Sequence, residues 1–172
     1  MTDGVEMSGA LDGIRVLDLS TLVQGPQAAA MLHDLGAEVL KIELPEIGDM
    51  GRHVGIVEEL GTSVFWEACN RGKRSVTLDL RTEAGKEAFL KLVEISDVVL
   101  SNFQPGTLEG WGLGYEDLAA INPGVIWAAG SFLGPPDQTL FGKVLTSSER
   151  PLVESSLGSE MTANPQQLLL LC

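Results

Sequence analysis

The chain has 172 residues, of which 44% are hydrophobic and 20% charged, a balance typical of a globular protein rather than a disordered one. Its formal net charge of −13 argues against a general role in binding nucleic acids or anionic membranes. No apolar run approaches the roughly 20 residues that span a bilayer. Residues 1–10 lack the basic residues of a targeting peptide, so we expect a cytoplasmic protein that begins with a flexible segment over residues 1–10.

The first part of the chain alternates between strand-like and helix-like segments. The patterns predict, in order, a buried strand over 14–19, a loop over 20–26, a helix over 27–35, a strand over 38–42 and a long loop over 45–61. Pro26 suits the first helical position and Gly36 suits the C-terminal cap. This segment therefore has the order strand, helix, strand.

The same alternation continues to residue 129. The patterns predict a strand over 75–80, a helix that begins at Thr82, a strand over 97–100, a short helix over 115–121 and a strand over 125–129. Strands that alternate with helices indicate right-handed crossovers and a mostly parallel sheet. We therefore expect an α/β fold, with a Rossmann-like, mostly parallel sheet and flanking helices.

Sheets of this kind bind ligands in the loops at the carboxyl ends of their strands. The loops of interest are 20–26, 43–52, 81–82 and 101–106. The first one follows a strand and precedes a helix, where backbone N–H groups can meet a phosphate. It matches neither the dinucleotide fingerprint nor the P-loop, which disfavours a Rossmann dehydrogenase and leaves open a plain connection.

Three cations stand close together before the strand at 75. Arg71, Lys73 and Arg74 repel one another, which favours an anionic ligand, although an exposed edge with counter-ions is the alternative. The loop over 101–106 offers an amide and an aromatic face that suit adenine, or else a buried Phe anchor. Two isolated histidines and two distant cysteines predict no metal site.

A set of short motifs recurs in a fixed order along this part of the chain. They are LDG at 11–13, VLD at 16–18, GP at 25–26, LGAEV at 35–39, KIE at 41–43, GD at 48–49, NRGKRS at 70–75, LDL at 78–80, DVV at 97–99, NFQPG at 102–106, GL at 112–113 and NP at 122–123. Together they resemble the N-terminal part of the class III CoA-transferases, the family of formyl-CoA transferase, carnitine CoA-transferase and α-methylacyl-CoA racemase.

The resemblance implies an enzyme that moves coenzyme A from an acyl-CoA to a carboxylic acid without a metal, in an interlocked homodimer. It implies an aspartate nucleophile and an aspartyl-CoA intermediate. It also implies that CoA contacts Val23, Gln24, Leu78, Asp79, Leu80, Arg81, Asn102, Phe103 and Gln104. Leu44 and Gly110 replace basic CoA contacts of formyl-CoA transferase, so the phosphates are expected to meet Arg52, Arg71 or Arg74 instead.

The resemblance ends near Gly134. We expect a partial CoA-transferase domain over 11–134 and a non-homologous tail over 135–172. Shifting the reading frame after about Pro135 permits a string that resembles the missing family segment. The hypothesis is that the tail is an out-of-frame translation, that the nucleophilic aspartate lies beyond the chain end and that this chain alone lacks transferase activity.

Two other functions stay open at this point. One is an acyl-CoA racemase fragment, which would abstract an α-proton rather than transfer CoA. The other is a non-catalytic module that binds CoA without turnover. Assays with an acyl-CoA and a carboxylate acceptor, set against loss of optical rotation, separate the two enzymes.

Overall fold

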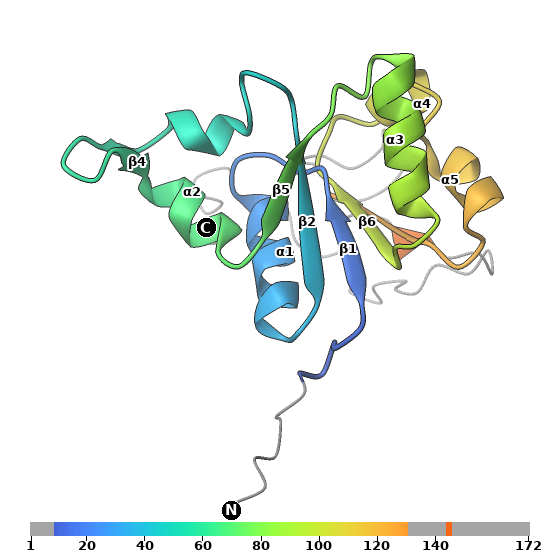
Figure 1. Ribbon diagram of the computed structural model, residues 1–172, viewed down its shortest axis with the longest axis horizontal. Helices are drawn as coiled ribbons and strands as arrows, with labels where there is room; N and C mark the ends of the chain where they lie inside the picture. The colour runs from blue at the N-terminus through green and yellow to red at the C-terminus, as the bar shows by residue number, and fades with distance from the viewer. Residues whose placement is uncertain (1–8, 131–143, 146–172) are drawn as a thin grey trace, which may run out of the picture.

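The computed structural model describes residues 9–130 and 144–145. One sheet of six strands runs through these residues (Figure 1). The strands are β1 (Arg15–Asp18), β2 (Glu38–Glu43), β5 (Arg74–Thr77), β6 (Val98–Ser101), β7 (Ile126–Ala129) and β8 (Val144–Leu145). Their order across the sheet is β5-β2-β1-β6-β7-β8. The pairs up to β7 are parallel and β7 pairs with β8 antiparallel, which confirms the expected α/β fold with a mostly parallel sheet.

Helices cover the two faces of this sheet. Side chains alternate between the faces of a strand, so Val16 and Leu17 of β1 point to opposite sides. Val16 packs with Ala29 of α1 (Gln24–Asp34), whereas Leu17 belongs to the larger core that contains Phe89 of α3 (Glu83–Val93). The α5 helix (Tyr115–Ile121) lies beside α3 and adds Leu118 to the same core (Figure 1).

The helix expected over residues 27–35 starts three residues earlier. Gln24 is its first residue and Pro26 is therefore its third rather than its first. The first four N–H groups of a helix have no partner within the helix, so proline costs no hydrogen bond there. Gly36 follows the helix with φ of +108°, and its N–H donates to the His33 carbonyl oxygen, as expected for a C-terminal turn.

The prediction of a long loop over residues 45–61 is wrong in part. This excursion contains a 3₁₀ turn, η1 (Met50–His53), and the strand β3 (Ile56–Val57), which pairs with β4 (Thr62–Ser63). It leads into α2 (Val64–Asn70), where the Ser63 hydroxyl accepts from the Trp66 N–H at 3.3 Å. The excursion projects from the sheet beside β2 and β5 (Figure 1).

The remaining elements follow the expected order with shifted bounds. The strand expected over 75–80 ends three residues early, because Thr77 is the last residue of β5. Thr82 caps α3 as expected, and α5 has the expected bounds. A short helix, α4 (Thr107–Gly110), was not expected. Most of residues 1–10 and, apart from β8, the tail over 135–172 lie outside the described residues.

Candidate functional site at the carboxyl edge of the sheet

The candidate site lies where the parallel strands end. Because β1, β2, β5 and β6 run in the same direction, the loops that follow them meet at one edge of the sheet. The nine residues expected to contact CoA follow three of these strands. Val23 and Gln24 come after β1, residues 78–81 come after β5, and residues 102–104 come after β6. The topology therefore places all three predicted segments at the same edge.

Asn102 joins two of these segments directly. Its Oδ1 accepts from the Thr21 N–H at 2.8 Å, and its Nδ2 donates to the Thr21 carbonyl oxygen at 2.8 Å. Each atom of the side-chain amide thus has a backbone partner 81 residues away in the sequence. Asn102 holds the β1–α1 loop against the loop after β6, a positioning role that the sequence did not indicate.

Val23 and Gln24 lie at the start of α1. Val23 is the N-cap residue, and its apolar side chain has no acceptor for a capping hydrogen bond. Gln24 is exposed, and its side-chain amide lies beside Gly130, just after β7. The first turn of α1 therefore presents backbone N–H groups and an amide side chain at the candidate site.

The other expected contacts divide between core and surface. Phe103 packs against the large core and meets Trp111 edge-on, with ring centroids 5.9 Å apart, so it is an anchor for its loop, whereas Gln104 is exposed. Leu80 is buried in that core. Arg81 is exposed and donates to both carboxylate oxygens of Asp79 at 2.8 Å, and these bonds lower the pKa of Asp79 to about 2.

A buried charge cluster lies beneath the β1–α1 loop. Its members are Asp18, Lys41, Asp49 and Lys73, whose side chains are each at most 1% exposed. Lys41 Nζ is 2.6 Å from Asp49 Oδ2 and 3.6 Å from Asp18 Oδ2. Lys73 Nζ is 2.8 Å from Asp18 Oδ2. Two carboxylates and two ammonium groups balance, which is the condition for holding charges out of water.

Lys73 therefore faces acceptors of the chain itself, which contradicts the expectation that it joins Arg71 and Arg74 in favouring an anionic ligand. Its Nζ donates at 2.8 Å to Asp18, to the Pro26 carbonyl oxygen and to Asn70 Oδ1. Burial lowers the pKa of Lys73, and the neighbouring Asp18 opposes that shift. Three acceptors around one ammonium group make it a link between α1, α2 and the end of β1.

Two of the arginines offered for phosphate binding lie away from the carboxyl edge. Arg71 pairs with Asp34, the last residue of α1, and this end of α1 lies toward the amino ends of the strands. Arg74 Nη2 is 3.7 Å from Glu38 Oε1, at the first residue of β2. Neither guanidinium reaches toward the loops of the candidate site.

Arg52 is the arginine of the three that lies at the carboxyl edge. It makes two hydrogen bonds of 2.8 Å to Glu43, the last residue of β2, and its guanidinium carbon is 3.4 Å from the centroid of the Trp66 ring. The side chain of Arg52 is still 40% exposed. It is therefore a cation that is held in place and partly open to solvent.

The pKa of Glu43 is strongly shifted in this setting. Burial acts to raise it, but hydrogen bonds from Arg52, from the Ser75 hydroxyl and from the Asp49 N–H lower it from 4.5 to about 2. A carboxylate with three kinds of donor around it is ionised throughout the physiological range.

Glu43 should make the stability of the fold depend on pH in acid. Its pKa is lower in the folded state, so its contribution is complete above about pH 5 and is lost as pH falls toward 2. The shift corresponds to about 3 kcal/mol. We expect urea unfolding at pH 6 to show a large deficit for Glu43→Gln, and the deficit to shrink as pH falls to 3. Glu116→Gln, an exposed change, is the control, and a deficit that stays constant with pH contradicts the prediction.

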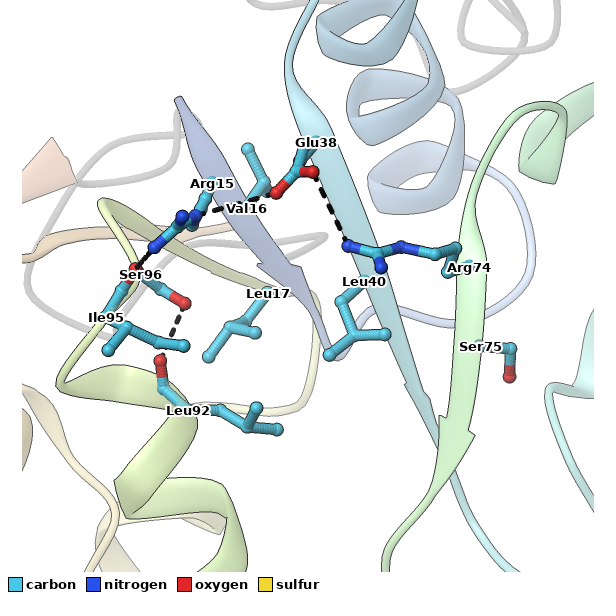
Figure 2. Close-up of a pocket in the computed structure, with 10 residues that line it drawn as sticks. All are labelled: Arg15, Val16, Leu17, Glu38, Leu40, Arg74, Ser75, Leu92, Ile95 and Ser96. Carbon is cyan, nitrogen blue, oxygen red and sulfur yellow. Dashed lines mark hydrogen bonds and ion pairs between the residues drawn. The ribbon is translucent and has the colours of Figure 1, made fainter. Parts of the chain in front are cut away.

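The described residues also form a cavity of about 520 Å³ elsewhere on the sheet (Figure 2). Leu17, Leu40 and Leu92 line it, and Arg15 and Arg74 both point toward Glu38 at its rim. It lies on the α3 face toward the amino ends of β1 and β2. The cavity is therefore separate from the loops where a ligand was expected.

Neither a metal centre nor a membrane span is seen in the part of the chain that the structure describes. Within residues 9–130 and 144–145, no three His, Cys, Asp or Glu side chains are grouped so as to hold a metal ion. In the same ranges, no helix has the length and apolar character needed to cross a bilayer.

The charge cluster is the feature that the sequence analysis missed. Strands buried on both faces read as continuous apolar runs. Asp18 interrupts one such run and Lys41 interrupts the next, with opposite charge and on strands that pair with each other in register. The two opposite charges within apolar runs were a signal available from the sequence, whereas the register that pairs them is seen only in the structure.

Comparison with known proteins gives the family. The family model described as "CoA-transferase family III" matches residues 11–139. This chain belongs to CoA-transferase family III. The match covers every strand from β1 to β7 and all three loops of the candidate site. The resemblance noted from the short motifs is thereby confirmed.

Relatives of this family III chain include a named CoA-transferase and proteins whose structures have been solved. Succinyl-CoA–D-citramalate CoA-transferase of Chloroflexus aurantiacus is 44% identical over 138 residues, which are 78% of this chain and 34% of that protein. A crystal structure of an Asp-to-Ala mutant of Rv3272 from Mycobacterium tuberculosis is 47% identical, with a TM-score of 0.67 over 71% of this chain and 33% of that one. A CaiB/BaiF family protein from Brucella suis is 45% identical, with a TM-score of 0.65 over 71% of this chain and 33% of that one.

These matches show the fold and the family of the chain. The family III chain spans about a third of the length of the curated relative from Chloroflexus aurantiacus. The activity of a whole transferase, its substrates and its assembly are therefore proposals for this chain.

Proposed function

We propose that this chain forms the CoA-binding part of a family III CoA-transferase. The observation that carries the proposal is the meeting of three predicted CoA segments at the carboxyl edge, with Asn102 and Thr21 clamped together there. Parallel α/β sheets bind their ligands at that edge. The membership of the chain in a CoA-transferase family supports the choice of ligand.

The charged groups at this edge suit an anionic ligand. Arg52 and Arg81 are both partly exposed there. Glu43 holds Arg52 and Asp79 holds Arg81. Fixed guanidinium groups recognise phosphate well because little side-chain freedom is lost on binding. We propose that the phosphates of CoA meet Arg52 and Arg81 rather than Arg71 or Arg74.

The reaction we propose is transfer of CoA from an acyl-CoA to a carboxylic acid. An aspartate attacks the acyl thioester, which forms a mixed anhydride and releases CoA as thiolate. The thiolate attacks the aspartyl carbonyl and releases the donor acid, which leaves an aspartyl-CoA thioester. The acceptor carboxylate repeats these steps in reverse and leaves as the new acyl-CoA. We do not propose any aspartate within residues 9–130 as this nucleophile. For the complete enzyme we propose a homodimer.

CoA binding by the 172-residue chain should depend on Asn102. Asn102→Ala removes two hydrogen bonds to Thr21 and frees the loop before Val23, so we expect the dissociation constant for CoA in isothermal titration to rise about tenfold. Activity with an acyl-CoA and a carboxylate acceptor, measured on the complete enzyme, distinguishes the transferase from a racemase.

The matched control is Asn122→Ala. The Asn122 side chain also binds backbone groups only, donating to the carbonyl oxygens of Val93 and Ser96 and accepting from the Gly124 N–H, but it lies near the amino ends of the strands. Its loss should affect stability similarly and leave CoA affinity unchanged. Equal weakening by both substitutions, or no saturable CoA binding by the unaltered chain, contradicts the proposed function.

A further inference from the structure

The β1–α1 loop contains a residue in an unfavourable backbone conformation. Leu22 has φ of +66°, in the left-handed region that residues with a side chain rarely adopt. Leu22 is 43% exposed, so burial of the leucine does not explain the conformation. Such a conformation persists only where the surroundings fix it, and it often marks a functional site.

Two side chains hold this loop from opposite directions. Asp49 Oδ1 accepts from the Leu22 N–H at 2.9 Å and from the Gly51 N–H at 2.6 Å. On the other side, Asn102 binds both backbone groups of Thr21. The peptide units before and after Thr21 are thus fixed by residues that come from two other loops of the carboxyl edge.

Asp49 is itself fixed from below. It is 1% exposed, its Oδ2 is 2.6 Å from Lys41 Nζ, and its own N–H donates to Glu43 Oε2 at 3.0 Å. Lys41 Nζ also donates to the Ser20 carbonyl oxygen. The buried charges therefore reach the backbone of the loop at Ser20 and at Leu22.

Packing alone does not account for these charges. Apolar residues of similar volume often replace a buried ion pair without loss of stability. A carboxylate can do what an apolar side chain cannot. Oδ1 of Asp49 accepts from the Leu22 N–H and from the Gly51 N–H, while Oδ2 pairs with Lys41. The arrangement thus fixes the direction in which the Leu22 N–H points.

We propose that Asp49 is a positioning residue of the CoA site. It holds Leu22 in the left-handed conformation and so sets where Val23 and Gln24 meet the ligand at the start of α1. Lys41 pairs with the Asp49 carboxylate and holds it in place. This inference rests on the proposed function, in which Val23 and Gln24 contact CoA.

The test is a double-mutant cycle on the 172-residue chain, read by isothermal titration with CoA. Asp49→Ala should raise the dissociation constant about tenfold, the effect of losing a hydrogen bond to a charged group. Glycine adopts the left-handed conformation without steric cost. In the Leu22→Gly background, Asp49→Ala should therefore raise the dissociation constant by less than about threefold. An equal effect in both backgrounds overturns the inference.

Asp49→Asn is the conservative variant if Asp49→Ala fails to fold. Its Oδ1 still accepts from the Leu22 N–H, so CoA affinity should stay close to that of the unaltered chain although the pair with Lys41 is lost. A loss of affinity as large as the alanine variant is expected to show, about tenfold, overturns the inference.

Amide hydrogen exchange separates this inference from the proposed function. Asp49→Ala should accelerate exchange of the Leu22 N–H and leave the β6 amides protected, and Asp49→Asn should retain the protection of the Leu22 N–H. If the unaltered chain binds no CoA, the proposed function fails and this exchange pattern still decides the role of Asp49. Exchange at Leu22 that is unaffected by Asp49→Ala overturns that role.

Discussion

Replacing Lys41 by methionine should lower the free energy of unfolding by about 3–5 kcal/mol. The substitution removes the ammonium group 2.6 Å from Asp49 and leaves that carboxylate buried without a lysine, whereas Asp18 keeps Lys73 at 2.8 Å. A carboxylate without a partner out of water is strongly unfavourable. Domains are stable by only about 5–15 kcal/mol, so the chain should unfold at much lower urea concentration. Urea unfolding followed by circular dichroism measures the effect.

Lys91→Met is the matched control for this substitution. Lys91 Nζ is 2.7 Å from Glu87 Oε1 on the exposed surface of α3, with side chains 68% and 71% exposed. Exposed pairs of this kind contribute little to stability, because water and salt screen the two charges. If the two substitutions change stability by similar amounts, the buried charges do not hold the fold together as described.

Replacing Phe89 by alanine should lower the free energy of unfolding by about 3–5 kcal/mol. Phe89 is fully buried on α3 and packs in the core that contains Leu17, Val99 and Leu118. Removing the ring loses its burial and leaves a cavity that neighbouring side chains fill only partly. Thermal unfolding should show a midpoint about 10 °C or more lower.

Met31→Ala provides the control on α1. Met31 lies within the helix and is 57% exposed, so little apolar burial is lost. A surface change of this kind should stay within about 0.5 kcal/mol of the unaltered chain. A Phe89→Ala protein as stable as Met31→Ala would mean that α3 does not pack on the sheet as described.

Elements with strong local signals were predicted well from the sequence. The bounds of α5 were expected because Asn122-Pro123-Gly124 stops a helix, and Thr82 was expected to begin α3 because its side chain can cap it. The parallel sheet followed from the alternation of strands and helices. The excursion with α2 was missed because Val64, Phe65 and Trp66 do not show the periodicity of an amphipathic helix.

The candidate site was predicted only as a set of loops. Its segments were indicated by strand ends and by family motifs, and the topology places them at one edge. Which cations lie there was not predictable, since Arg52, Arg71 and Arg74 look alike in the sequence. Their carboxylate partners determine where they lie. Arg52 pairs with Glu43 at the end of β2, and Arg74 pairs with Glu38 at its beginning.

The sequence by itself determined the fold class, the order of most elements and the family, because hydrophobic periodicity, turn residues and short motifs are local properties of the chain. Only the tertiary structure decided that Lys73 is buried, that Asn102 binds Thr21 and that Asp49 holds Leu22. These contacts join residues 27 to 81 positions apart. Their geometry depends on how β1, β2, β5 and β6 lie against one another, and no local pattern encodes that arrangement.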